Sequence, residues 1–341
     1  MMTTTLHTDA PQRLREFARR SAAVGVVVWA LLMLTATSDS RETELVHRIV
    51  FFAVLVLVPL GLSLVATVGQ TSGFGLLRVA VLGQPVAAIL TVLSFFIEKG
   101  WGSATLAAVW LLFNAIVALF GLTRLLSRGL YPLYESSIDA GLLYLPVAGA
   151  WLIVYRLGMQ LFGYGEMIIL LTVVHFHFAG FAAPIIAGVT GRRLAEKENR
   201  TGRTFPVIVL LLVAAMPLVA AGITFSPWLG LLGTLLLAFG LVLLAVLTIF
   251  KVLPAVPSFG ARLLLAIGAS SSCAAMVLAC LYSYSLVAHI LILRIPTMAL
   301  THGLLNAFGF ATCSLLAWSR ITQQYAPATP PQPRQAVAQP R

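Results

Sequence analysis

The chain has 341 residues, of which 60% are hydrophobic and only 10% are charged, and its mean hydropathy is +0.97. Soluble domains carry about 25% charged residues, so this composition excludes an ordinary soluble protein. The net charge of +11 would suit nucleic-acid binding in a soluble protein. Here the basic residues stand between apolar runs, which indicates a role in membrane orientation and no nucleic-acid partner. The three cysteines lie in apolar runs and predict no disulfide framework.

Apolar stretches of membrane-spanning length follow one another along the chain. A bilayer core of roughly 30 Å needs about 20 apolar residues at 1.5 Å per residue. The sequence therefore predicts an all-α polytopic transmembrane bundle of about ten spans within residues 21–320. We expect a basic cytoplasmic segment at 1–20, without a signal cleavage site, and a disordered Pro- and Gln-rich tail at 321–341. The predicted spans are 21–37, 46–68, 76–97, 104–126, 140–157, 165–190, 205–224, 228–250, 261–288 and 296–319.

Charge asymmetry orients these spans. With the N-terminus inside and each span reversing the chain, most of the 22 Lys and Arg residues fall on the cytoplasmic side. The outer side receives only Arg41, Arg48, Lys99, Arg156 and Arg294. This distribution follows the positive-inside rule. We therefore expect both termini in the cytoplasm and a multi-pass protein of the bacterial cytoplasmic membrane, with membrane lipid as its surroundings.

Polar side chains within the spans are the candidate functional residues, because polar groups at membrane depth are costly and often mark function. The sixth span contains His175 and His177, with Glu166 at its start, and the tenth contains His302 and Asn306. Both spans run from outside to inside in the predicted topology. The histidines and Asn306 therefore lie at comparable depth, and we expect them to meet in one pocket.

Helical spacing limits what these residues do together. His302 and Asn306 are four residues apart and share a helix face. His175 and His177 are two residues apart, about 200° around a regular helix, and make a poor chelating pair. The sequence predicts no metal site and no cofactor. The segments HFAGFA (177–182) and NAFGFA (306–311) resemble each other, but they are too short to establish a repeat.

Further residues are assigned by their position along the chain. Glu166 is the available carboxylic acid if it points inward. We expect His47, Glu135 and Asp139 to be surface groups. There is no HExxH, Walker, GxSxG or Asp-rich diphosphate motif. The residues expected to shape a substrate pocket or to bind a head group are Phe176, Phe178, Tyr282, Tyr284, His289 and Arg294.

Two segments, VVHFHFAGFAAPIIAG (173–188) and MALTHGLLNAFGF (298–310), resemble the YndJ-like family of bacterial polytopic membrane proteins. The resemblance extends over about residues 20–320. It implies a polytopic architecture and points to His175, His177, His302 and Asn306. It supplies no reaction.

The leading functional hypothesis is an integral membrane enzyme that acts by acid–base chemistry on a lipophilic, isoprenoid-like small molecule. In it, a histidine or Glu166 donates a proton, and His302 with Asn306 accepts or positions one. The first alternative is a transporter or permease for a small or amphipathic molecule that uses the same histidines. The second is a structural or assembly factor, in which the polar groups only hold helices together.

Overall fold

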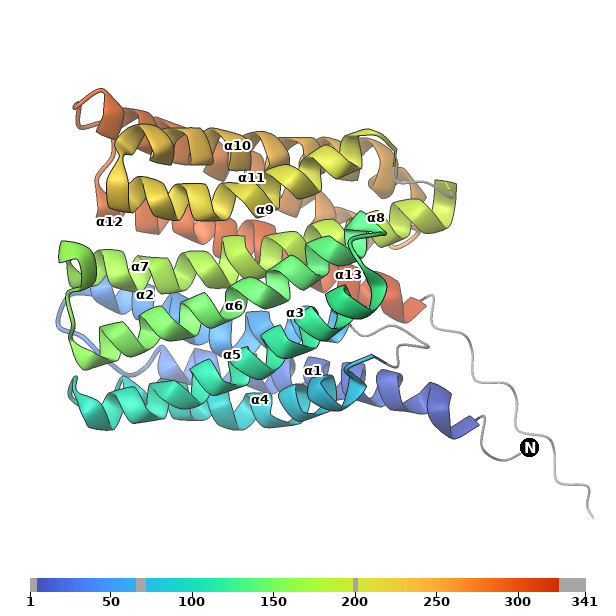
Figure 1. Cartoon of the computed structure of the whole chain (residues 1–341), viewed down its shortest axis with the longest axis horizontal. Coiled ribbons are helices and arrows are strands. Elements are labelled where there is room, and N and C mark those ends of the chain that lie inside the picture. Colours follow the sequence, from blue (N-terminus) through green and yellow to red (C-terminus); the bar gives the residue numbers. More distant parts are fainter. Residues whose placement is uncertain (1–4, 66–71, 199–201, 325–341) are drawn as a thin grey trace, which may run out of the picture.

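The computed structural model describes residues 5–65, 72–198 and 202–324, and these contain helices and connecting turns but no strand. The long helices run along one common axis (Figure 1). The part of the predicted tail beyond residue 324 lies outside the described residues. The helices are α1 (Thr5–Leu32), α2 (Arg41–Phe52), α3 (Val58–Val65), α4 (Phe74–Ser94), α5 (Trp101–Arg128), α6 (Leu133–Leu157), α7 (Glu166–His175), α8 (Ala183–Glu198), α9 (Thr204–Phe225), α10 (Pro227–Leu247), α11 (Phe259–Val287), α12 (Ile295–Met298) and α13 (Cys313–Gln324).

Nine continuous helical segments within the described residues are long and apolar enough to cross a bilayer. Helix α1 adds a tenth helix, and it packs against α3 and α4. The expected basic segment and the expected first span form this single helix, which begins at Thr5 and ends at Leu32, five residues before the predicted end. Leu14 and Ala18, within the basic part, are buried. The structure confirms the all-α polytopic bundle.

Three of the crossing segments are interrupted helices that lie together. They are α2–α3, α7–α8 and α12–α13, and they run in the same direction (Figure 1). Helix α2 contacts α7, and α13 contacts both α3 and α8. The segment Arg41–Val65 is buried over the whole of its most apolar window. The remaining helices surround this group, so these three segments form the interior of the bundle.

Each of the three segments is interrupted by π-helical turns, namely η1 (Ala53–Leu57), η3 (Phe176–Ala182), and η6 (Ala299–Gly303) with η7 (Leu305–Thr312). Pro59 and Pro184 follow η1 and η3 within two residues. Proline lacks the N–H that an α-helix needs and crowds the carbonyl of the preceding turn, so a widened turn before it relieves both problems. Such turns occur often at functional sites.

The two look-alike segments, HFAGFA and NAFGFA, fall in η3 and η7, which contact each other. The helices that carry them are parallel, so they are not related by an inverted repeat (Figure 1). The similar sequences mark two π-helical turns that face each other inside the bundle.

A buried ion cluster lies where α5, α6 and α8 meet, and it corrects the expectation that Glu135 and Asp139 are surface groups. Asp139 is fully buried, and its Oδ2 accepts a hydrogen bond of 2.6 Å from Arg128. Glu135 accepts bonds of 2.6 and 2.7 Å from Arg192, whose Nη1 also donates to the carbonyl of Leu64. The carboxylates are drawn inside because three arginines, including Arg124, neutralise them there.

A second buried network lies at the other end of the bundle and corrects the expectation that His47 is solvated. His47 is 2% exposed, its Nδ1 lies 2.8 Å from Thr37 Oγ1, and its Nε2 lies 2.7 Å from Tyr155 Oη. Glu44 accepts bonds from Thr37 and pairs with Arg48. Helix α2 begins at Arg41, five residues before the predicted span, because Ser40 caps it, and this places His47 inside the bundle.

Candidate functional site

The structure separates the two histidines of the sixth span. His177 is fully buried, and its Nε2 accepts a hydrogen bond of 3.1 Å from the indole Nε1 of Trp110 on α5. Its Nδ1 lies 2.8 Å from the carbonyl of Val173. A carbonyl only accepts and an indole N–H only donates, so these bonds assign the proton to Nδ1. Both ring nitrogens are satisfied, and His177 joins α5 to η3.

His175 faces the tenth span. Its ring centroid lies 6.3 Å from that of His302, and the two ring planes differ by 25°. His175 Nδ1 lies 2.7 Å from the carbonyl of Leu171, which assigns the proton to Nδ1 and leaves the lone pair on Nε2. The side chain is exposed, although it lies at the middle of a long apolar segment and beside a neighbouring helix. His175 therefore presents an accessible basic nitrogen at membrane depth.

His302 and Asn306 share one helix face, and the backbone of α11 orients them. His302 Nδ1 lies 2.9 Å from the carbonyl of Ala275, so its proton is also on Nδ1. Asn306 Nδ2 donates to the carbonyl of His302 at 3.1 Å and lies 3.3 and 3.2 Å from the two ring nitrogens. These nearly equal distances place the amide over the ring and leave the lone pair of Nε2 open.

The polarity of this group follows from its hydrogen bonds. The N–H groups of His175 and His302 point to backbone carbonyls, and Asn306 Nδ2 points to another. The groups that remain are acceptors, namely the two Nε2 atoms and the amide oxygen of Asn306. No Asp or Glu occurs along α11, or between Met167 and Ala195, or from Ile295 to Thr322. The site is a set of acceptors without a carboxylate.

The structure does not bring Glu166 to the histidines. It begins α7, nine residues before His175, or roughly 14 Å along the axis. Its carboxylate pairs with Lys99 Nζ at 2.6 Å, and its side chain is 53% exposed. Arg156, the other basic group expected near it, is buried and donates instead to the carbonyl of Ile97 at 2.6 Å.

The predicted aromatic residues are spread over several places. Phe176 packs against Tyr144 and Met216, and Phe178 belongs to the main core, so both are buried away from the open face of His175. Tyr284 is 51% exposed on α11. Tyr282 is half-buried and lies seven residues after Ala275, which places it on the same helix face, roughly 10 Å farther along the axis.

His289 and Arg294 lie in the turn between α11 and α12. Both are exposed, His289 has a φ of 55°, and Arg294 is the residue before the first turn of α12. The structure therefore unites His175, His302 and Asn306, while the other predicted site residues occupy separate positions.

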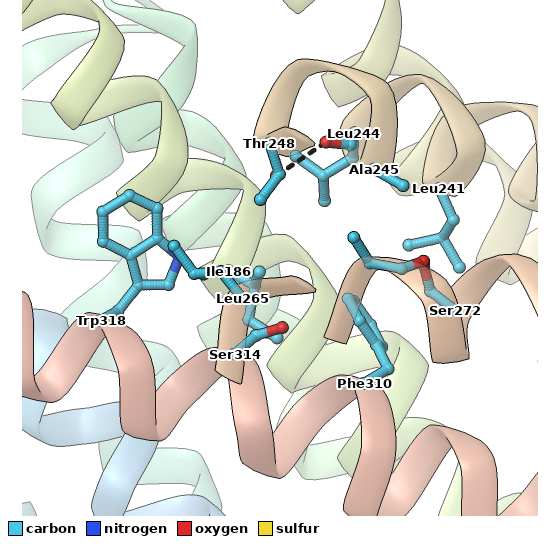
Figure 2. A pocket seen from close by; sticks show the side chains of 11 residues that line it. Ile186, Leu241, Leu244, Ala245, Thr248, Leu265, Ser272, Phe310, Ser314 and Trp318 are labelled. Atoms are coloured by element: carbon cyan, nitrogen blue, oxygen red, sulfur yellow. Dashed lines mark hydrogen bonds between the residues drawn. The ribbon is translucent and has the colours of Figure 1, made fainter. Parts of the chain in front are cut away.

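Two enclosed spaces and a search for metal-ligand groups complete the survey. Among the described residues, no group of three or more His, Cys, Asp or Glu side chains is placed to hold a metal ion. Figure 2 shows a cavity of about 10 Å³ between α8, α10, α11 and α13, which has room for one water molecule. A larger pocket, of about 290 Å³, opens between α2, α7 and α12. Only the larger one has the size of a ligand site.

Comparison with known proteins identifies the relatives of this chain. A family model described as YndJ-like protein matches residues 48–310, which is more than half of the sequence. The chain belongs to the YndJ-like family. It is 30% identical over 234 residues to the "Uncharacterized membrane protein YndJ" of Bacillus subtilis (strain 168), an alignment that covers 69% of this chain and 41% of that protein. No solved structure matches.

The YndJ-like match includes the four residues that the sequence resemblance pointed to, His175, His177, His302 and Asn306. It begins at Arg48, one residue after His47. This chain spans about two-fifths of the length of the B. subtilis relative. Together, the family and the nine apolar crossing segments among the described residues make the chain a multi-pass membrane protein.

The sequence analysis missed two kinds of residue. Trp110, the partner of His177, gave no signal, because a tryptophan in an apolar span is ordinary. His47 was placed outside the second span because Arg48 follows it. The signal that was available is the apolar run IVFFAVLVLVPL directly after Arg48. A chain already inside a helix at Ile49 extends back through His47 to the cap at Ser40.

Proposed function

We propose that this protein is a membrane-embedded enzyme that moves a proton within a lipophilic small molecule, with His175 as the base. The observation that carries the proposal is the open Nε2 of His175 beside the ring of His302, 6.3 Å between centroids. Histidine is the usual side chain for general acid–base catalysis. A position in the middle of the bilayer favours a substrate that reaches the site from lipid.

The fixed tautomers support this role. Each imidazole has its Nδ1 proton held by a backbone carbonyl, so Nε2 is the atom available to a substrate. The ring that accepts a proton at Nε2 keeps its Nδ1 bond, which then stabilises the charged ring. Asn306 lies over the His302 ring and fixes its orientation. Residues that hold the acid–base groups in place remove part of the entropic cost of the reaction.

The distance between the rings limits the number of protons that the site holds. Two positive rings about 6 Å apart would repel each other by roughly 2–3 kcal/mol at an effective dielectric constant of 20. The pair therefore carries one proton at a time. A proton that leaves the substrate for Nε2 of His175 returns to a different atom of the same substrate. Such an isomerisation balances without a co-reactant.

Transport is the second candidate function, and the three interrupted parallel helices favour it. Interrupted helices around a midplane site are a feature of many transporters. The pocket of about 290 Å³ opens at one end of these helices. A transport cycle needs access from the other end as well. The histidines in this candidate bind the transported molecule.

The third expectation, an assembly role, accounts for part of the polar groups. His177 and His47 have both ring nitrogens bonded to other parts of the bundle, as helix-joining groups do. His175 bonds only to the carbonyl of its own helix and is exposed. This difference supports a separate role for His175.

We also propose a location in the bacterial cytoplasmic membrane, with both termini inside and with lipid as the partner. Two observations support this orientation. The first helix begins and α13 ends at the same end of the bundle (Figure 1). Arg124 and Arg128 on α5 lie at the end of the bundle where α8 brings Arg192, which agrees with the positive-inside rule.

Isotope transfer tests the proposed reaction. Membranes that contain the wild type, His175→Ala or His302→Ala would be incubated in deuterated water with a bacterial lipid extract and examined by mass spectrometry. We expect a compound to gain deuterium and to convert to an isomer of the same elemental composition in the wild type only. Loss of a general base lowers such a rate by about 10²–10⁴-fold.

Trp228→Phe, an exposed position on α10, is the matched control and is expected to behave like the wild type. Equal deuterium incorporation in all the variants would refute the enzyme proposal. A His175-dependent change in the distribution of a compound across the membrane, without isomer formation, would favour the transport candidate instead.

A further inference from the structure

The pocket of about 290 Å³ lies at the end of the bundle where all three interrupted segments begin. Residues from α2, α7, α12 and η6 line it together. Its walls are mostly apolar, and its charged residues, Arg41 and Glu42, stand exposed in the first turn of α2. The apolar wall consists of Leu45, Met167, Ile295, Pro296, Ala299 and Leu300.

The pocket leads toward the histidine pair along two of its walls. Ala299 and Leu300 lie within one helical turn of His302 in the sequence. Met167 lies eight residues before His175 on the same segment, or about 12 Å along the axis. A molecule that occupies the pocket therefore extends from the exposed end of α2 toward the open Nε2 atoms.

The hydrogen bonds of the pair decide which polar group fits there. Three acceptors remain open, Nε2 of His175, Nε2 of His302 and Oδ1 of Asn306, so the ligand has to supply the hydrogen. An ammonium group would need a carboxylate at this depth, and none occurs on the helical segments that form the site. A hydroxyl donates a hydrogen bond without bringing a charge into the membrane.

The volume sets the size of the ligand. At roughly 30 Å³ for each non-hydrogen atom, which is the share of one water molecule in the liquid, the pocket holds about ten such atoms. The pocket is thus too small for a diacyl phospholipid and is suited to a medium-length aliphatic or terpene-like chain.

We infer that the ligand of this site is a neutral, hydroxyl-bearing amphiphile of about ten non-hydrogen atoms, with its hydroxyl on His175, His302 and Asn306 and its apolar body in the pocket between α2, α7 and α12. This inference rests on the proposed function, because it names the substrate class of the same site. It concerns binding alone, and so it is measured separately from turnover.

Ligand-dependent thermal unfolding of the protein in lipid nanodiscs tests the inference, with tryptophan fluorescence as the readout. The probes are 1-decanol, 1-methoxynonane, which has the same number of heavy atoms but no donor, and 1-octadecanol, which is too long. A ligand that binds the folded state raises Tm. We expect 1-decanol to raise Tm by a few degrees, and the ether and the long alcohol to have little effect.

Variants show whether the alcohol occupies this pocket. Leu300→Trp and Thr297→Trp each fill it from an exposed position and are expected to abolish the shift. His175→Phe is expected to remove the preference for the alcohol over the ether. Leu291→Trp, which is exposed in the turn before α12 and outside the pocket, is the matched control and should keep the full shift.

The outcomes separate the two proposals. Equal shifts with alcohol and ether, or a shift that persists in both pocket-filling variants, would overturn the inference. If His175-dependent isotope transfer then remains, the proposed function stands without it. If 1-decanol binds as expected while no compound undergoes isotope transfer, the ligand class stands and the enzyme proposal fails.

Discussion

The imidazole rings of His175 and His302 lie nearly parallel, with planes 25° apart and centroids separated by 6.3 Å, although 127 positions along the chain separate the two residues. Their helices run in the same direction, and a π-helical turn begins directly after His175 and another contains His302. The relationship divides the polar residues of the spans into those that bond within the protein and those that are left open.

The two histidines of the sixth span should respond differently to substitution. His177→Leu leaves the indole N–H of Trp110 buried without a partner, at a cost of about 1–3 kcal/mol. His175→Leu removes a single bond to its own helix and should leave the free energy of unfolding within about 0.5 kcal/mol of the wild type.

Thermal or denaturant unfolding of both variants in nanodiscs measures this difference. Trp110→Phe should restore part of the stability of His177→Leu, because it removes the unpaired donor. Equal destabilisation by His175→Leu and His177→Leu would contradict the separate roles assigned to them.

The network around His47 predicts a coupled loss of stability. Tyr155→Phe removes the 2.7 Å bond to His47 Nε2 and leaves a buried polar atom unpaired, which costs about 1–3 kcal/mol. His47→Leu with Tyr155→Phe should cost less than the sum of the two single changes, because both remove the same bond. A double-mutant cycle measured by unfolding checks this, and strict additivity would contradict it.

The ion cluster predicts that one carboxylate is worth far more than another. Glu135→Gln leaves Arg192 and Arg124 without their shared counter-charge in a buried setting, and breaking such a pair costs about 3–5 kcal/mol. Glu196 pairs with Arg193 on the same helix but is 67% exposed, so Glu196→Gln should change stability by at most about 1 kcal/mol. Unfolding of the two variants side by side decides the point.

The turn between α9 and α10 depends on a glycine. A Cβ at Gly222 would lie 2.1 Å from the Cα of Gly230, and both contacts there are backbone. Gly222→Ala should therefore push the two helices apart and lower Tm. Gly83→Ala, on α4, meets nothing within 4 Å and should be neutral or stabilising by about 0.5–1 kcal/mol. A Tm for Gly222→Ala equal to that of Gly83→Ala would refute the close packing.

Composition and periodicity were sufficient to predict the architecture, because apolar runs of membrane length leave few alternatives. Spacing also predicted that His302 and Asn306 share a face, and the sequence of the sixth span separated His175 from His177. Partners from distant segments were beyond reach. The pairing of His177 with Trp110, and of Glu135 with Arg192, depends on how helices are placed side by side, which apolar sequences specify only weakly.

Expected helix boundaries were wrong where a charge stands inside a buried helix. Arg48 and Asp139 look like the edges of spans, yet both are buried because oppositely charged side chains or backbone carbonyls satisfy them. A single sequence does not show such compensation. The same limit explains why Glu166 was considered as an inward-facing acid before Lys99 was known to be its partner.

The widened turn Phe176–Ala182 has a consequence for how the bundle tolerates insertions and deletions. Removing one residue there would restore a regular helix and rotate everything after it by about 100°. His175 would keep its place, but Arg192 would swing away from Glu135 and from the carbonyl of Leu64. The phase of one helix is thus shared between the midplane site and the ion cluster, and a change in length at η3 breaks one to preserve the other.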